Sequence, residues 1–414
     1  MADDWGRRRV EPVAVGPPRR RANRVDRIRA ERNHRRRRFV GGFSLALLIV
    51  VVIGAVFLGS KLWHTLFGEG DDFSGDGTND VVIQVHDGDS TTAIGQTLQD
   101  RNVVATVSAF VNAADGNAAI SSIQPGFYKV RTEIPAANAV ERLADPQNRV
   151  GKLVIPEGRQ LDDLQDVKTN AVTDGIFSLI SKSTCVNLDG DRTCVPVDDL
   201  KKVAASAEPA ALSVPNWAMS AVTALGNDHR RLEGLIAPGT WNIDPSAQPQ
   251  DIMSTLIGAS ATQYEQGGLL DTAKAMNMSP YQILTVGSLV QRESTPEDFG
   301  KVARVIYNRL AENRTLEFDS TVNYPLDRIE VATTDADRAQ NTLWNTYVRP
   351  GLPATPICSP GHPALAAAEQ PEPGDWLYFV TIDMQGTTLF TRDYQQHLAN
   401  IELAKRNGVL DSAR

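Results

Sequence analysis

One stretch of the chain, residues 279–324, combines a regular apolar pattern with a polar residue at one position of that pattern. Apolar side chains three and four positions apart predict a helix that begins after Ser279, a good N-cap, with Pro280 as its first residue. The apolar stripe consists of Ile283, Val286 and Val290. The next position on the stripe is Glu293, so a carboxylate stands in the last helical turn where a core residue is expected. Residues 295–298 predict the cap and first turn of a second helix.

The position of Glu293 predicts a raised pKa for its carboxyl group. Burial disfavours the ionised form, and the carbonyl-rich end of a helix repels negative charge. Together these effects would keep the group protonated near neutral pH, as a general acid must be. The alternative is a structural ion pair between Glu293 and an arginine of the second helix, either Arg304 or Arg309.

Near the N-terminus, residues 39–59 form an uninterrupted uncharged run of bilayer-spanning length. Residues 1–38 before it contain fourteen arginines against five acidic residues, so this tail carries about +9 and the remainder of the chain about −17. A basic flank predicts that the N-terminus stays in the cytoplasm and that the rest is extracytoplasmic. The arginines then serve topology and lipid contact, and we expect no nucleic-acid partner. Since no A-x-A cleavage site follows the run, it predicts an uncleaved single-pass anchor in the cell membrane.

After a polar, glycine-rich linker, the pattern changes to a small unit with β-α-α-β order. Its expected elements are a strand at 81–85, helices at 91–101 and 108–114, a strand at 125–130 and a helix at 136–143. This arrangement resembles a LysM-like carbohydrate-binding module.

The remaining chain predicts a larger region of mixed helices and strands, which gives an α+β fold class overall. The pattern predicts a strand, a turn and the start of a helix at 153–164, a helical stretch at 250–277, a β-hairpin at 376–394 and a final helix at 394–407. Residues 165–225 have no clear period. They contain Cys185 and Cys194, and outside the cytoplasm we expect a disulfide to close the polar loop between these cysteines.

Several classes of enzyme are disfavoured by what the sequence lacks. There is no Walker loop, G-x-G-x-x-G, H-E-x-x-H or G-x-S-x-G motif, and the six histidines include no pair at metal-ligand spacing. We therefore expect no metal and no cofactor. Cys358 has no matched general base, which favours a packed thiol over a nucleophile. Glycosidic cleavage needs mainly an acid beside the leaving oxygen, and Glu317 and Asp319 are candidates for the second carboxylate of an ordinary glycosidase.

Several blocks, in order and at fitting spacing, resemble the endolytic murein transglycosylase (YceG-like) family from about residue 39 onward. The blocks are V-I-P-E-G (154–158), L-E-G-L-I-A-P-G-T-W (232–241), S-L-V-Q-R-E (288–293), V-I-Y-N-R-L (305–310), L-E-F-D-S-T-V-N-Y (316–324), N-T-Y-V-R-P-G-L-P-A-T-P-I-C-S-P-G (345–361) and L-Y-F-V (377–380). The resemblance implies that Glu293 is the catalytic glutamate. The sequence departs from the family pattern at Gln291, where many members have an acid. The residues that the resemblance places near the substrate are Gln291, Asp319, Asn323, Tyr324, Asn345 and Tyr347.

By this resemblance, the chain is expected to cleave the MurNAc–GlcNAc β-1,4 bond of nascent peptidoglycan strands without hydrolysis. Glu293 would act first as acid and then as base, leaving a 1,6-anhydro-MurNAc end that terminates elongation of the strand. Two alternatives remain open: a non-catalytic peptidoglycan-binding scaffold, and a hydrolytic muramidase with Asp319 or Glu317 as base. A pyridoxal-phosphate-dependent aminodeoxychorismate lyase, a label given to similar chains, is disfavoured by the expected anchor.

The predicted organisation follows from these elements. We expect a disordered cytoplasmic tail at 1–38, a transmembrane helix at 39–59, a linker at 60–80, a LysM-like subdomain at 81–150, a connecting region with the two-cysteine insertion at 151–245, and a catalytic domain at 246–414. The expected partners are glycan strands, the cell membrane, and peptidoglycan synthases or other divisome or elongasome proteins.

Overall fold

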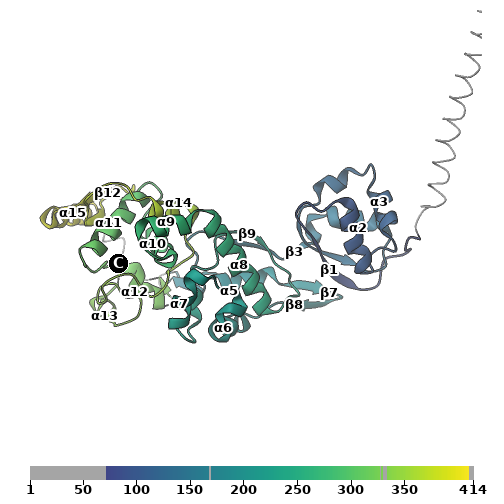
Figure 1. Ribbon diagram of the computed structural model, residues 1–414, viewed down its shortest axis with the longest axis horizontal. Coiled ribbons are helices and arrows are strands. Elements are labelled where there is room, and N and C mark those ends of the chain that lie inside the picture. Colours follow the sequence, from purple (N-terminus) through teal and green to yellow (C-terminus); the bar gives the residue numbers. More distant parts are fainter. Residues whose placement is uncertain (1–70, 167–168, 327, 330–332, 410–414) are drawn as a thin grey trace, which may run out of the picture. The chain divides into compact units, whose positions relative to one another are not determined.

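The computed structural model describes residues 71–166, 169–326, 328–329 and 333–409 (Figure 1). The basic tail and the expected anchor at 39–59 lie outside these residues. Within the described part of the chain, no helix is both long and apolar enough to cross a bilayer. The mixed α/β class expected from the sequence is confirmed by the helices and small sheets described below.

Residues 80–150 form three strands and three helices around a hydrophobic core of their own. The elements are β1 (Asp80–Val85), α2 (Thr91–Asp100), α3 (Val107–Ala114), β2 (Gly126–Arg131), α4 (Ala136–Ala144) and β3 (Arg149–Val150), with short 3-10 turns at Ala118–Ser122 and Pro146–Asn148. The strands make an antiparallel sheet in the order β1-β2-β3. Ser90 and Thr106 cap α2 and α3 by accepting backbone N–H groups, as their residue types favour. The β-α-α-β order is therefore present as expected.

The region after Gly151 contains the other described strands, which form small separate sheets. These strands are β4 (Lys152–Ile155), β5 (Leu164–Asp166), β6 (Val172–Thr173), β7 (Val186–Leu188), β8 (Asp191–Thr193), β9 (Gly239–Asn242), β10 (Arg328–Ile329), β11 (Tyr378–Thr381) and β12 (Thr388–Thr391). Strand β4 pairs with β9, β5 lies between β10 and β6, and β7–β8 and β11–β12 are hairpins. The C-terminal hairpin expected at 376–394 is confirmed.

The helices of this region are α5 (Ile176–Ser183), α6 (Val197–Ser206), α7 (Asn216–Ala224), α8 (Pro249–Gln266), α9 (Leu269–Met276), α10 (Pro280–Glu293), α11 (Phe299–Ala311), α12 (Asp319–Asn323), α13 (Asp335–Arg338), α14 (His362–Glu369) and α15 (Tyr394–Arg406), with 3-10 turns at Pro209–Leu212, His229–Leu232 and Tyr324–Leu326. Most of these helices contribute to one hydrophobic core, whereas α12, α13 and α15 lie outside it.

Helix α10 is the central element, and it packs against α9, α11 and α14. Ser279 and Gln282 form a capping box, and Pro280 is the first helical residue, so the expected helix start is confirmed. Every residue from Ile283 to Val290 is buried, which is typical of a helix enclosed on all sides. Gly287 permits the close approach of α14, because a Cβ atom there would lie 3.3 Å from Cδ1 of Leu365. The helix up to Val290 is therefore fixed in a packed interior, and its last turn emerges from that interior.

Four local predictions differ from the structure. The helix start expected at the end of 153–164 is absent, and the chain there enters strand β5. The helical stretch 250–277 is two helices, because Gly268 adopts a φ of +99° that ends the regular backbone between α8 and α9. Helix α11 begins at Phe299, after a turn in which Asp298 donates its N–H to the Thr295 carbonyl. Residues 165–225 contain α5, α6 and α7, and the last two bury only two side chains each, too few to give a clear apolar period.

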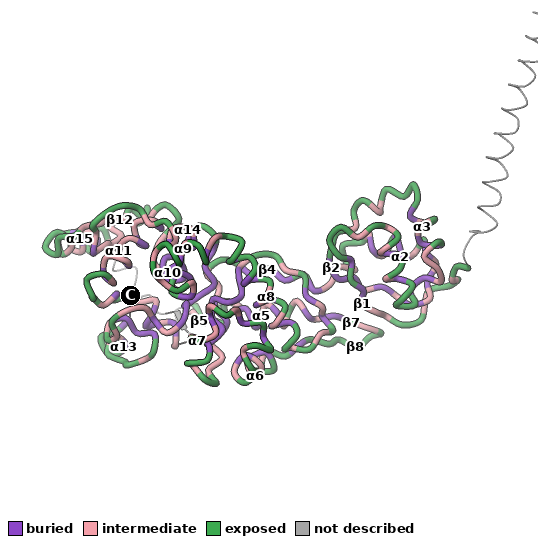
Figure 2. Tube along the Cα trace, viewed as in Figure 1, coloured by how far each residue is buried: buried purple, intermediate pink, exposed green. Residues whose placement is uncertain are grey.

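A disulfide joins Cys185 and Cys194 across the base of the β7–β8 hairpin. Most of this hairpin is exposed, as the trace near β8 shows (Figure 2). Val186 is its one fully buried strand residue. An exposed hairpin of three-residue strands has little packing to hold it, so the covalent link is its main restraint.

We expect the double variant Cys185→Ser/Cys194→Ser to unfold more easily than the wild type. A cross-link between residues nine positions apart removes about 2–3 kcal/mol of chain entropy from the unfolded state. Urea unfolding followed by circular dichroism measures the change. Cys358→Ala serves as the control for loss of a thiol outside the hairpin. An unfolding free energy equal to that of the wild type would show that the hairpin is held by its packing alone.

Candidate active site

Glu293 is the last residue of α10, and its partly buried carboxylate meets the start of α12. Ser320, in the first turn of α12, donates its hydroxyl hydrogen to Oε1 of Glu293 in a short hydrogen bond. The alternative ion pairs are absent among the described residues. The guanidinium of Arg304 donates to the carbonyls of Pro371 and Glu372, and that of Arg309 donates to backbone carbonyls and to Glu317. Glu293 is therefore left without a neutralising arginine contact.

The environment of Glu293 raises the pKa of its carboxyl group to about 7. Burial is the largest cause, because it disfavours the charged form. The hydrogen bond from Ser320 lowers the pKa, the negative charge of Asp319 raises it, and the positive charge of Arg292 lowers it. Burial therefore dominates, as the sequence predicted. A carboxyl group with this pKa can donate a proton at neutral pH and take one back.

The environment of Asp319 lowers the pKa of its carboxyl group, in contrast to that of Glu293. Its oxygens accept hydrogen bonds from Thr333 Oγ1 at 2.7 Å, Tyr347 Oη at 2.7 Å, and Arg338 Nε and Nη2 at 3.2 and 3.1 Å. Burial raises its pKa, but the bonds from Arg338, Tyr347 and Thr333 outweigh burial and hold the pKa below its usual value. Three of these bonds are accepted by Oδ1 and one by Oδ2. Asp319 is therefore a negative charge near Glu293 that its hydrogen bonds hold in place.

Glu317, the other candidate for a second carboxylate, faces a different set of partners. Its Oε2 lies 3.3 Å from Nη1 of Arg309, and its Oε1 accepts the Thr315 hydroxyl at 2.9 Å. The side chain is 48% exposed. Glu317 has a φ of +56°, a left-handed conformation that an L-residue seldom adopts, and its N–H donates to the Thr346 carbonyl. These contacts give it a structural role in the loop before α12.

Two residues expected to line the cleft lie in the interior instead. Tyr324 is 3% exposed and donates its hydroxyl to Oε2 of Glu233 at 2.8 Å. Asn345 is 1% exposed, and its amide group donates to the carbonyls of Arg338 and Gln340 and accepts the N–H of Tyr347. Their polar groups are used internally, so they support the site rather than contact a substrate.

The other expected residues lie closer to the acid. Tyr347 is partly exposed, and its hydroxyl joins the hydrogen bonds around Asp319 while the Arg338 guanidinium stacks 5.2 Å from its ring centroid. Gln291 lies two residues before Glu293. Its side-chain oxygen accepts the N–H of Gly361 at 2.8 Å, which links the last turn of α10 to the loop before α14. Asn323 is partly exposed at the end of α12.

Sequence reasoning missed three residues of this arrangement. Ser320 lies in the segment 316–324, where the carboxylates of Glu317 and Asp319 are the evident acid or base candidates and a serine hydroxyl gives no distinct signal. Arg338 could be found only through its contact with Asp319. Glu233 is buried beneath the site, where it accepts the Leu161 N–H at 3.1 Å and the Tyr324 hydroxyl, and burial raises its pKa to about 8. Its signal was present, since a Glu between Leu232 and Gly234 interrupts an apolar segment.

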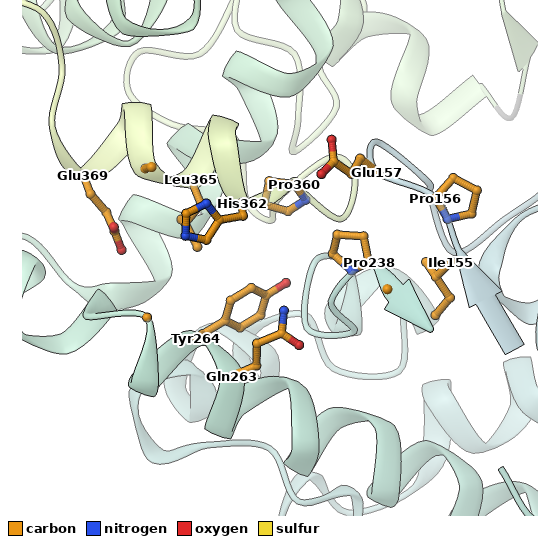
Figure 3. A pocket seen from close by; sticks show the side chains of 13 residues that line it. Ile155, Pro156, Glu157, Pro238, Gln263, Tyr264, Pro360, His362, Leu365 and Glu369 are labelled. Atoms are coloured by element: carbon orange, nitrogen blue, oxygen red, sulfur yellow. The ribbon is translucent and has the colours of Figure 1, made fainter. Parts of the chain in front are cut away.

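A cavity of about 310 Å³ lies apart from Glu293, between the turn after β4 and the start of α14 (Figure 3). Prolines 156, 238 and 360 form one side, and Gln263 and Tyr264 of α8 form the other. His362 and Glu369 of α14 close its end (Figure 3). Glu293 does not line this cavity.

Two further features of the described residues bear on the chemistry of the site: the absence of a metal-ligand group and the state of Cys358. In the described ranges, no group of three or more His, Cys, Asp or Glu side chains could hold a metal ion. Cys358 is fully buried, its thiol donates to the Ser288 carbonyl, and burial raises its pKa, so the expected packed thiol is confirmed. The arrangement can therefore supply one proton-transferring carboxyl group beside a fixed negative charge.

Comparisons with known proteins indicate the family. The profile of the YceG-like family matches residues 83–403. The endolytic murein transglycosylase of Bacillus subtilis (strain 168) is 27% identical over 325 residues, which cover 78% of this chain and 84% of the relative. The endolytic murein transglycosylase of Streptococcus pneumoniae serotype 2 (strain D39 / NCTC 7466) is 23% identical over 333 residues, covering 78% of this chain and 58% of the relative. The crystal structure of a YceG-like protein from Listeria monocytogenes aligns with 77% of this chain and 98% of its own at 24% identity and a TM-score of 0.47.

Proposed function

Because the chain belongs to the YceG-like family, we propose that it is an endolytic lytic transglycosylase that cuts peptidoglycan strands at the MurNAc–GlcNAc β-1,4 bond. The observation that carries this proposal is the environment of Glu293: a single carboxyl group with a pKa of about 7, while hydrogen bonds from Arg338, Tyr347 and Thr333 hold the pKa of the nearby Asp319 below its usual value. A reaction that needs one group to serve as acid and then as base suits this arrangement.

In the first step, protonated Glu293 donates its proton to the glycosidic oxygen, and the bond from that oxygen to the anomeric carbon of MurNAc breaks. The hydroxyl of Ser320 holds Oε1, so Oε2 is the oxygen that carries the proton to the substrate. The N-acetyl carbonyl of the substrate stabilises the positive anomeric carbon, which replaces the second carboxylate of ordinary glycosidases.

In the second step, ionised Glu293 removes the proton of the C6 hydroxyl of the same sugar. The C6 oxygen then bonds to the anomeric carbon, which gives a 1,6-anhydro-MurNAc end and returns the proton to Glu293. No water is consumed. The fixed charge of Asp319 supports this cycle because it discourages Glu293 from remaining ionised after the first step.

The proposal extends to where the reaction occurs. Residues 39–59 would anchor the enzyme in the cell membrane with its N-terminus in the cytoplasm, and the LysM-like unit would bind glycan beside the catalytic region. Such an enzyme would meet strands as synthases extrude them, so synthases of the divisome or elongasome are the expected neighbours.

Product analysis tests the reaction. We expect the purified full-length chain, incubated with intact peptidoglycan, to release internal fragments that end in 1,6-anhydro-MurNAc, detected by mass spectrometry. Reducing MurNAc ends would contradict the proposal and favour a hydrolytic muramidase with a water-activating carboxylate. Binding to peptidoglycan without any cleavage would favour the non-catalytic scaffold.

A further inference from the structure

A second, smaller recess lies beside the last turn of α10. Its volume is about 210 Å³, and its charged lining comes from Glu157, Arg159, Asp162 and Arg292. The turn that carries Arg159 touches α10, because a Cβ atom at Gly158 would lie 3.5 Å from Cγ of Gln291. Arg292 immediately precedes Glu293, and its charge is close enough to lower the pKa of that carboxyl group. The recess therefore borders the helical turn that carries Glu293, although Glu293 is not one of its lining residues.

Neither arginine of the recess, Arg159 or Arg292, has an ion-pair partner among the described residues, although other arginines of this region form ion pairs. The Nε atom of Arg159 is buried and has no hydrogen-bond partner in the described part of the chain. A buried guanidinium nitrogen without a partner carries a desolvation cost that an anionic ligand would offset.

The acids of the recess do not cancel this positive charge. Asp162 already lies 2.6 Å from Lys201 Nζ and 2.6 Å from His229 Nε2. Burial raises its pKa, but these two partners lower the pKa to about 2, so its charge is matched outside the recess. Glu157 remains as one acid against two arginines. The recess thus has a net positive charge on a chain whose residues after 38 carry about −17.

The backbone holds Arg159 in a fixed position. Its carbonyl accepts the N–H of Ser359 at 2.8 Å, and the Gly158 N–H donates to the Ser359 carbonyl at 2.9 Å, which forms an isolated β-bridge. Ser359 is fully buried, and its hydroxyl donates to the Ile236 carbonyl. A guanidinium placed on such a rigid support is preorganised for a ligand.

We infer that this recess binds a free carboxylate of the peptide stem that the muramic acid of peptidoglycan carries. This inference rests on the proposed function and adds a part of the substrate that the acid itself does not contact. The stem begins on the sugar whose glycosidic bond is cleaved with the help of Glu293, and an extended peptide advances about 3.5 Å per residue, so carboxylates of its first few residues can reach a recess near the last turn of α10. Paired guanidinium groups are well suited to hold a carboxylate.

The charge of the whole chain strengthens the need for such a site. Peptidoglycan stems are anionic, and a surface with a large negative charge repels them. The two arginines of the recess provide local attraction for an anionic stem. The recess therefore selects strands that still carry stems and disfavours strands from which the stems have been removed.

The test compares two substrates: strands with intact stems, and the same strands stripped of stems by an amidase. We expect full-length wild type to show a higher kcat/KM on the first. Arg159→Gln should lower the ratio of the two kcat/KM values by about 10-fold or more, as expected for loss of a charge-assisted hydrogen bond. Arg292→Gln should lower the same ratio. Because Arg292 is exposed, this variant is expected to fold, and it therefore tests the recess even if the Arg159 variant misfolds. Lys274→Gln, which removes an exposed charge on α9, is the matched control.

A direct binding measurement keeps the inference separate from the proposed reaction. We expect a soluble muramyl peptide with free carboxylates to bind the full-length chain more tightly than its amidated form in calorimetry, and we expect Arg159→Gln to remove that difference. A ratio unchanged in both arginine variants, or equal binding of the two peptides, would overturn the inference. Stem-dependent binding without cleavage of either substrate would support this site and contradict the proposed function.

Discussion

Glu293→Gln should abolish formation of anhydro ends, with kcat/KM lower by about 10³-fold or more. Glutamine keeps the shape of the side chain and can still accept the Ser320 hydrogen bond, but it can neither donate the proton to the leaving oxygen nor remove the proton from the C6 hydroxyl. General acid–base groups contribute typically about 10²–10⁴ in rate, and here one residue serves in both steps. Quantified anhydro-MurNAc ends from wild type and variant, at equal protein concentration, measure the effect.

A stability measurement provides the control for this variant. A carboxyl group whose pKa is raised from 4.5 to about 7 by folding stabilises the protein fully below pH 4.5, and that contribution is lost as the pH rises through 7. Glutamine has no such loss. We therefore expect the Tm of Glu293→Gln to equal or exceed that of the wild type at pH 8. Retained cleavage by this folded variant would remove Glu293 from the mechanism.

Asp319→Asn should shift the alkaline limb of the kcat/KM profile to lower pH. The negative charge of Asp319 raises the pKa of Glu293, so its removal lowers that pKa. The unpaired positive charge of Arg338 would act in the same direction. Because the protonated fraction of an acid falls about tenfold per pH unit above its pKa, we expect roughly tenfold lower kcat/KM at pH 8 and little change at pH 5.

Glu317→Gln is the matched control, since it removes a carboxylate two positions away whose partners are Arg309 and Thr315. Its alkaline limb should coincide with that of the wild type. An equal loss of activity at every pH in Asp319→Asn would indicate that Asp319 supports the fold of the loop without tuning the acid. A loss of activity in Glu317→Gln that Asp319→Asn does not show would support Glu317 as a base.

The place of the acid was predictable because it depends on local rules. Ser279 and Pro280 start a helix, the apolar stripe fixes its phase, and fourteen residues later Glu293 closes it. Burial then raises the pKa for the reason that the pattern suggested. The small β-α-α-β unit and the C-terminal hairpin were predictable for the same reason, since their strands and helices carry complete periods.

The surroundings of the acid depend on contacts between distant residues, which periodicity does not encode. Nothing local indicates that Ser320 reaches Glu293, that Arg338 holds Asp319, or that Tyr324 turns inward to Glu233. The assumption that motif residues line the cleft placed Tyr324 and Asn345 at the substrate, whereas polar groups of both satisfy buried partners. Buried polar residues in a motif can be needed for the site without touching what it cleaves.

Hydrogen bonds between α10 and segments later in the chain determine when Glu293 becomes catalytically competent during synthesis of the protein. The N–H of Ile357 donates to the hydroxyl of Ser288, and that of Gly361 donates to Gln291, so residues about 70 positions later complete the last turn around Glu293. A growing chain exposes Glu293 several seconds before these residues exist, at roughly 5–20 residues per second. A chain arrested near residue 340 should therefore cut no glycan, although it already contains the acid and Ser320. Newly made molecules would remain harmless to the wall until almost the whole polypeptide has been released.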